Sequence, residues 1–250
     1  MSNQVEDDLL QMIEQLKNAS ASDVVNIDDF VIKKEEDLLT PDGFGNTLLM
    51  WAIKGGKLNQ INPSLITERL ILKENTFGNN AIHVAGECGC IADLPASVLT
   101  EDNFFKKNRL GATPLHHAAN EGLLDKVPRQ FLTKERMLEE DDVKLSPLHY
   151  AAYSGHINSI PKDFLTEEHL LHESSEGKTA LGMAIEHAEE NSNYQELKEI
   201  PRLLKTGTIK RMLGEGHGEF ELFLERELSY RIIKKRLKKA EDINLDEIPQ

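Results

Sequence analysis

The sequence predicts an all-α fold, a solenoid of stacked helix pairs with capping helices at both ends, on three observations. A twelve-residue segment recurs at a constant interval without a gap, its copies open with residues that start helices, and most copies close with a glycine that ends one. We therefore expect an N-terminal cap helix and half-repeat at 1–41, five repeats at 42–207 with the fifth extended, and a hinge with an amphipathic helix at 208–250.

The five copies share one pattern of helix signals. Thr or Ser at the third position of four copies is a helix N-cap residue, whose oxygen accepts a backbone N–H that the helix leaves unpaired. Pro114 and Pro147 follow at the first helical position, where a missing N–H costs nothing. Leu or Ile at the fifth position points into the stack, and alanine at the eighth lets neighbouring helices approach closely. The copies are GNTLLMWAIKGG from Gly45, GNNAIHVAGECG from Gly78, GATPLHHAANEG from Gly111, KLSPLHYAAYSG from Lys144 and GKTALGMAIEHA from Gly177.

This interval, about the 33 residues of an ankyrin unit, and the T-P-L-H-x-A-A core resemble the ankyrin repeat family. The segments Gly111 to Gly122 and Lys144 to Gly155 carry this resemblance best, and it extends over about residues 42–207. It implies a protein that binds other proteins and catalyses nothing. It also implies that His83, His116 and His149, which share one repeat position, tie adjacent turns together by hydrogen bonds.

The second half of each unit departs from the family pattern. An I-P-x-x-F-L-T segment, best seen at Ile160 to Thr166, stands where the family has one long helix. Proline starts helices and Thr166 caps another turn, so we expect two short helical pieces in the outer layer. Ile200-Pro201 follows Ile160-Pro161 at more than the constant interval, which indicates added residues near 188–195 and longer helices there.

Both ends of the stack need a cap because a terminal repeat leaves an apolar face uncovered. At the N-terminus we expect a helix with a stripe formed by Leu9, Leu10, Ile13 and Leu16. We interpret residues 23–41 as a half-repeat and Ser20 to Asp23 as the connector between the two.

At the C-terminus, Gly214, Gly216 and Gly218 predict a flexible hinge. The helix that follows has a stripe of Phe220, Leu224, Leu228 and Ile232. Its first half is acidic and its second half basic, so it either caps the stack or contacts an anionic membrane, a protein or a second copy.

Composition narrows the classes of partner. The formal net charge of the 250 residues is −14, which disfavours nucleic acid and favours a basic protein, although solubility alone also explains it. We expect no transmembrane segment, because no apolar run approaches ~18 residues, and no secretory signal, because the first residues are acidic. Cys88 and Cys90, the two cysteines, are badly spaced for a disulfide. We therefore expect a cytoplasmic protein.

Candidate catalytic and metal-binding groups have simpler explanations. Cys88-Gly89-Cys90 with His83 lacks the spacing of a zinc site, and plain small core residues are the better interpretation of both thiols. The Gly214-Glu215-Gly216-His217-Gly218 segment is not a complete phosphate-binding motif. The run Glu139 to Asp142 reads as a solvated loop. We expect no metal and no cofactor. An enzyme with a site in residues 188–250 remains an alternative, motivated by the insertion, the glycines and the charged helix.

The resemblance places a protein-binding surface on the concave side of the stack. Family members bind there through turn tips and the exposed face of each first helix. Trp51, Tyr150 and Tyr153 are the sharpest candidates because aromatics tend to form hot spots, with partial burial between units as the alternative for each. The full set of expected partner-binding residues is Phe44, Phe77, Arg109 and Val143 at the tips, and Trp51, Lys54, His117, Asn120, Tyr150 and Tyr153 on the helices.

Overall fold

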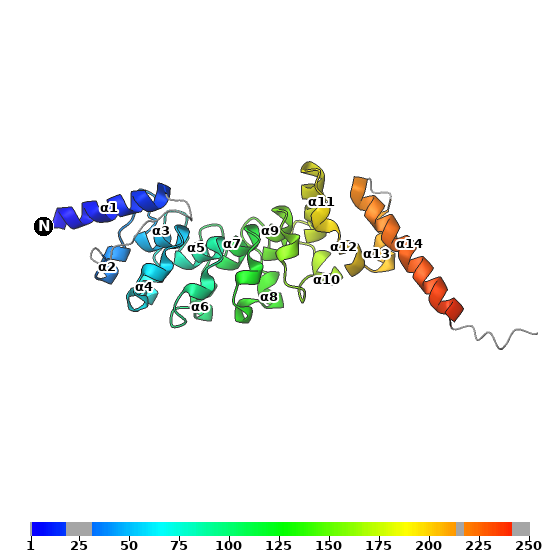
Figure 1. The fold of residues 1–250 in the computed structure, drawn as a ribbon, viewed down its shortest axis with the longest axis horizontal. Coiled ribbons are helices and arrows are strands. Elements are labelled where there is room, and N and C mark those ends of the chain that lie inside the picture. Colours follow the sequence, from blue (N-terminus) through cyan, green and yellow to red (C-terminus); the bar gives the residue numbers. More distant parts are fainter. Residues whose placement is uncertain (1, 19–31, 214–217, 242–250) are drawn as a thin grey trace, which may run out of the picture.

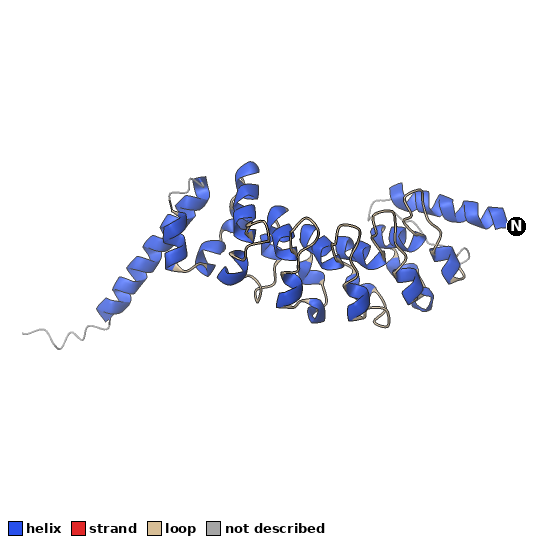
Figure 2. Cartoon of the chain, turned by 180° about the vertical axis from the view of Figure 1, so that it is seen from behind, coloured by secondary structure: helices blue, strands red, loops and turns tan. Residues whose placement is uncertain are grey.

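The computed structural model describes residues 2–18, 32–213 and 218–241, and within them it is a row of short helices (Figure 1). The first helices of the five units stand side by side on one edge of the row, and shorter pieces lie along the other (Figures 1 and 2). Each first helix packs on the next one in sequence. They are α3 (Leu48–Lys54), α5 (Ala81–Cys88), α7 (Pro114–Asn120), α9 (Pro147–Tyr153) and α11 (Ala180–Glu190).

The core runs along the faces on which successive first helices pack, as the repeat pattern predicts, and continues into the outer pieces. The fifth-position residues Leu49, Ile82, Leu115, Leu148 and Leu181 are all buried, and so are the eighth-position alanines. The predicted caps form as well: Thr47 accepts the Met50 N–H, and Thr179 accepts the Gly182 N–H. In the second copy Asn80 takes this role and accepts from the N–H groups of Ile82 and His83.

Three buried histidines join neighbouring units, which confirms the role that the resemblance implied. In His83, His116 and His149, Nδ1 lies 3.1–3.3 Å from the backbone nitrogen of the N-cap residue of the same helix and accepts its hydrogen. Nε2 lies 3.0–3.2 Å from a backbone carbonyl oxygen of a following segment, on Ala112, Glu139 or Lys178. Each ring therefore fixes the start of its own helix and the position of the segment beyond it.

The outer layer consists of short pieces, as the I-P-x-x-F-L-T segments predict. Thr67, Thr100, Thr133 and Thr166 each cap a four-residue α-helix by accepting the N–H three residues on. These helices are α4 (Glu68–Ile71), α6 (Glu101–Phe104), α8 (Lys134–Met137) and α10 (Glu167–Leu170). Single 3₁₀ turns precede them: η1 (Leu58–Gln60), η2 (Pro63–Leu65), η3 (Ile91–Asp93), η4 (Leu124–Lys126), η5 (Arg129–Phe131) and η6 (Ile157–Ser159).

The fifth unit is longer than the others. Its first helix, α11, has 11 residues, against seven or eight in α3, α5, α7 and α9. The outer pieces that follow are η7 (Gln195–Leu197), α12 (Ile200–Leu203) and α13 (Thr206–Met212). The lengthening expected near 188–195 thus appears in α11 but not in the helix that follows it, since α12 keeps the four-residue length of the other outer helices; α13, further along, has seven residues.

Lys144 occupies a turn position that glycine holds in the other four copies. Its φ is +66°, in the left-handed region that costs a residue with a Cβ about 1–2 kcal/mol. Lys144→Gly is therefore expected to raise the free energy of unfolding by roughly 0.5–1 kcal/mol, after the entropy gained by the unfolded chain is deducted. Urea denaturation checks this. Gly78→Ala is the opposite control, because its φ is +77° and a Cβ would lie 2.7 Å from the Arg109 nitrogen, so stability should fall.

The N-terminal helix α1 (Ser2–Asn18) packs on α3. Leu9, Ile13 and Leu16 of the predicted stripe are buried, but Leu10 is 40% exposed and Met12 is buried instead. Leu10 lies about 100° around the helix from Leu9, so the face that meets α3 excludes it. α2 (Glu35–Leu38) belongs to the expected half-repeat, whereas the connector from Ser20 to Asp23 lies outside the described residues.

The C-terminal helix α14 (Gly218–Glu241) packs mainly on α12 and α13. Phe220 and Leu224 of its predicted stripe are fully buried and Leu228 partly, but Ile232 is 42% exposed. Beyond Leu228, the contact with α12 is made by Arg231. Its guanidinium nitrogens donate to the carbonyl oxygens of Leu204 at 2.5 Å and Pro201 at 2.7 Å. Only the first half of the stripe is therefore apolar packing. The predicted hinge at 214–217 lies outside the described residues.

Candidate functional site: the turn tips and the first-helix groove

Four exposed apolar side chains stand at equivalent turn positions, one in each of four successive units. We name Phe44, Phe77, Leu110 and Val143 the turn-tip row; they are 62%, 61%, 59% and 48% exposed. Backbone hydrogen bonds tie the turns edge to edge, because the carbonyl oxygens of Phe44, Phe77 and Leu110 accept the N–H of a residue in the next turn at 2.9–3.1 Å. The row is thus a fixed line of apolar side chains on the surface.

A polar residue two positions before each tip holds the turn in shape. We name Asp42, Asn75, Asn108 and Asp141 the turn anchors. In each, Oδ1 accepts two backbone N–H groups, two and four residues on, at 2.9–3.1 Å. Asp and Asn suit this position because a short side-chain oxygen reaches its own following backbone. The anchors therefore order the backbone that presents the turn-tip row.

The same anchors hold three ring side chains of the first helices, nine residues further along the chain. Trp51 Nε1 donates to Asp42 Oδ2 at 3.0 Å, and the Tyr150 hydroxyl donates to Asp141 Oδ2 at 2.7 Å. His117 Nε2 lies 3.3 Å from the Asn108 amide nitrogen. These hydrogen bonds fix the ring orientations, so a partner would meet side chains that are already ordered.

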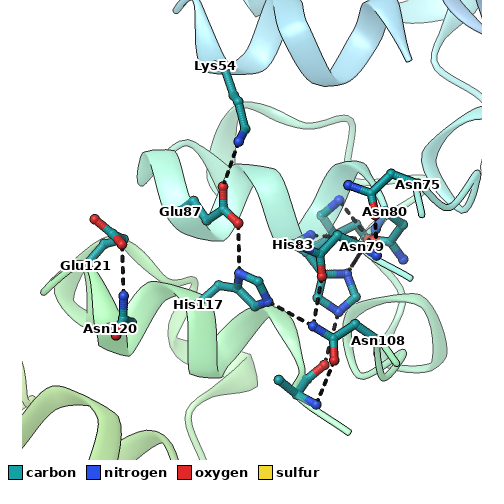
Figure 3. A network of polar contacts seen from close by, with 12 residues as sticks. Lys54, Asn75, Asn79, Asn80, His83, Glu87, Asn108, His117, Asn120 and Glu121 are labelled. Atoms are coloured by element: carbon teal, nitrogen blue, oxygen red, sulfur yellow. Dashed lines mark hydrogen bonds and ion pairs between the residues drawn. The ribbon is translucent and has the colours of Figure 1, made fainter. Parts of the chain in front are cut away.

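A chain of polar contacts crosses three units on this face (Figure 3). Lys54 Nζ lies 3.3 Å from one oxygen of Glu87, and His117 Nδ1 lies 2.9 Å from the other. The Asn108 amide group donates to Asn79 Oδ1 at 2.8 Å and approaches His117 Nε2, so the ring hydrogen that faces Glu87 lies on Nδ1. Burial alone would raise the pKa of Glu87, but the His117 hydrogen bond and the Lys54 charge lower it below its ordinary value.

A groove of about 430 Å³ lies beside this network. Phe77 and Leu110 of the turn-tip row form part of its wall, and other turn residues and side chains of α5, α7 and α9 line the rest. Apolar and polar groups therefore converge there, as they do in binding sites for peptides and small molecules. The lining also includes Glu87, Arg109, His117, Asn120, Glu121 and Tyr150.

A family model for ankyrin repeats, in three copies, matches residues 97–161. Residues 97–161 contain ankyrin repeats. The matched segment includes α7, α9 and the tips Leu110 and Val143. The units on either side keep the same spacing, an N-cap at the same position and the same helix-on-helix packing. No curated protein matches the chain. Ankyrin repeats are generally protein–protein interaction modules.

The expected binding residues fall into two groups. Phe77, Arg109, His117, Asn120 and Tyr150 lie together on the groove. The others belong to neighbouring units: Phe44, Trp51 and Lys54 to the first, and Val143 and Tyr153 to the fourth. Trp51 and Tyr150 are partly buried against the core, which is the alternative that we considered, whereas Tyr153 is 62% exposed.

Two sequence interpretations need correction. Leu110, not Arg109, holds the tip position of the third unit, because it directly precedes Gly111 as Phe77 precedes Gly78. Arg109 is exposed one position earlier.

The run Glu139 to Asp142 is not a solvated loop. Asp141 is a buried turn anchor, and Glu139 pairs with Lys107 at 2.8 Å and Arg136 at 2.9 Å. The recurrence of Asp or Asn at the same position of each unit was the signal that identifies the anchors.

Neither cysteine lies in the surroundings that a reactive thiol needs, within the residues that the structure describes. Cys88 is exposed, contrary to the expectation of a core residue, because it faces outward on the last turn of α5. Cys90 is partly buried, and burial raises its pKa to about 12, which is the reverse of what a nucleophilic thiol needs. Within the described ranges, no three His, Cys, Asp or Glu side chains gather to hold a metal ion. The Gly214 to Gly218 segment falls largely outside those ranges.

Proposed function

We propose that the ankyrin stack binds a protein partner across the turn-tip row and the adjacent first-helix face, the concave surface of the family. The observation that carries this proposal is the turn-tip row itself. Single exposed apolar residues are common on soluble proteins, but here one recurs in each of four successive turns at 48–62% exposure. Contact with water does not stabilise such a row, whereas contact with a complementary apolar ridge on a partner does.

The chemistry of the groove supports a partner segment with both apolar and basic side chains. Phe77 and Leu110 offer apolar contact, and Glu121 is an exposed carboxylate on the same groove. The net charge of −14 would attract a basic partner over a longer range. No helix in the described part of the chain is long and apolar enough to cross a membrane.

Truncating the row tests the proposal. In Phe77→Ala/Leu110→Ala, two neighbouring exposed side chains shrink without opening the core, so folding should be retained while partner binding falls at least ~10-fold. Proteins captured from a native lysate by this variant and by the unaltered chain are compared by quantitative mass spectrometry. The matched control is Val5→Ala/Leu10→Ala, which removes two exposed apolar side chains from α1 and should leave capture unchanged. Equal recovery of every partner by all three proteins would contradict the proposal.

A further inference from the structure

Helix α14 has an apolar stripe that no other described part of the chain covers. Phe220, Leu224 and Arg231 face α12 and α13. Away from this contact, Leu222, Tyr230 and Ile233 are 57%, 59% and 55% exposed, and Tyr230 lies on the flank, beside a groove that Pro201 and Arg202 also line. Their offsets of eight and eleven residues place them along one side of the helix, since an α-helix turns about 100° per residue. We name these three residues the α14 stripe.

The charges of α14 are divided between its two ends. Residues 218–229 contain four acidic residues and one basic residue, whereas residues 230–241 contain six basic residues and one acidic residue. A parallel neighbour of the same sequence would place like charges side by side along the whole length. An antiparallel neighbour would place each acidic half beside a basic half. The division of charge therefore favours a second copy of α14 in the antiparallel orientation.

The helix is held firmly at the point where the charge changes sign. Arg231 donates to two carbonyl oxygens at the end of α12 and pairs with Glu227 at 2.7 Å. Figure 1 shows α14 beyond the repeats, with its second half reaching away from them. A second chain can therefore approach the α14 stripe without meeting the ankyrin stack, and little ordering is needed on association.

We propose that two copies of the chain associate through antiparallel pairing of their α14 helices, with the α14 stripes in contact along the centre. The interface is two-fold symmetric, because each copy offers the same stripe and the same pair of charged halves, so the assembly closes as a dimer. Each dimer carries a turn-tip row at both ends of a longer body. This adds bivalent binding to the proposed function without depending on it.

Charge reversal with rescue tests the orientation. One variant, Lys234→Glu/Lys235→Glu, lowers the net charge of residues 230–241 from +5 to +1, and a second, Glu221→Lys/Glu225→Lys, changes that of residues 218–229 from −3 to +1. Each alone should raise the dimer dissociation constant at least ~10-fold in analytical ultracentrifugation of the full chain, because the first variant weakens the attraction between the facing halves and the second turns it into repulsion. An equimolar mixture of the two variants should regain association as a mixed dimer. Ile233→Asp should also dissociate the dimer, since it puts a charge into the stripe.

The repeats offer a control with the same change in charge. Lys106→Glu/Lys162→Glu changes two lysines on the repeats by the same total charge and should leave association unaltered. A chain that stays monomeric up to the solubility limit would overturn the proposal, and so would a mixture that fails to associate. A monomeric chain that pellets with phosphatidylserine vesicles would assign the helix to a membrane surface instead. None of these results bears on the turn-tip row.

Discussion

Lowering the pH from 7.5 to 5 is expected to reduce the free energy of unfolding by about 4 kcal/mol through two buried histidines. Burial lowers the pKa of His83 to about 3 and that of His116 to about 4, with the neighbouring His117 ring adding to the effect on His83. In the unfolded chain each would titrate near 6.5. Between the folded and the unfolded pKa values, these histidines bind a proton in the unfolded chain but not in the folded chain.

The sign of the effect follows from this difference. The stability contributed by the neutral histidines is complete above pH 6.5 and is lost as the pH falls towards the folded pKa values. A pH of 5 is about 1.5 units below the pKa of a histidine in the unfolded chain. The unfolding free energy therefore falls by roughly 2 kcal/mol for each of the two residues. Burial also lowers the pKa of His149, so its contribution has the same sign.

Urea denaturation at a series of pH values measures this effect. His116→Gln cannot titrate, so the difference in unfolding free energy between pH 7.5 and pH 5 should shrink by about 2 kcal/mol in the variant. Its lower stability at pH 7.5 gives the separate structural cost of losing the links to Thr113 and Glu139. An unchanged pH dependence in His83→Gln and His116→Gln would show that the buried rings do not couple folding to protonation.

The second large effect is expected from Phe104, in the outer layer. Its ring is fully buried and stacks on Phe131 with centroids 4.0 Å apart and planes 5° apart, while Phe105 meets it edge-on at 4.9 Å. The Arg136 guanidinium covers the Phe105 ring at 3.8 Å. This cluster joins the outer pieces of two successive units, so Phe104→Ala should destabilise the protein by about 3–5 kcal/mol.

Phe105→Ala is the matched comparison, because this neighbouring ring is only partly buried and should cost about 1–2 kcal/mol. Circular dichroism in urea gives the free energies. Hydrogen exchange should show the loss concentrated around α6 and η5, since a repeat contacts mainly its neighbours. Equal effects of the two substitutions would mean that the stacked pair does not hold the outer layer together.

The features repeated in every unit could be predicted from the sequence, because the same local signals recur at the same positions of each copy. N-caps at Thr47 and Thr179 and the inward leucines are of this kind. The contact of Lys54 with Glu87, and of Glu87 with His117, could not be predicted in the same way. It joins different residue types from three units, and only the offset between neighbouring helices brings them together.

The ends of the chain were harder to predict for a related reason. A stripe on an amphipathic helix shows which residues can be buried, but the docking angle decides how far along the helix burial continues. In α14 the contact with α12 ends in Arg231 and leaves Ile232 at the surface. In α1 the docking angle buries Met12 and leaves Leu10, which the stripe included, at the surface.

Site-specific photo-crosslinking in the native cell tests the binding surface most directly. A photoreactive phenylalanine analogue at position 77 or 110 lies in the turn-tip row, and the same analogue at position 5 lies on α1, away from it. We predict that positions 77 and 110 crosslink to one common protein, and that truncating Phe44 and Val143 reduces this crosslink while position 5 gives none. Crosslinks to that protein from position 5 alone, with none from the row, would contradict the proposed binding surface.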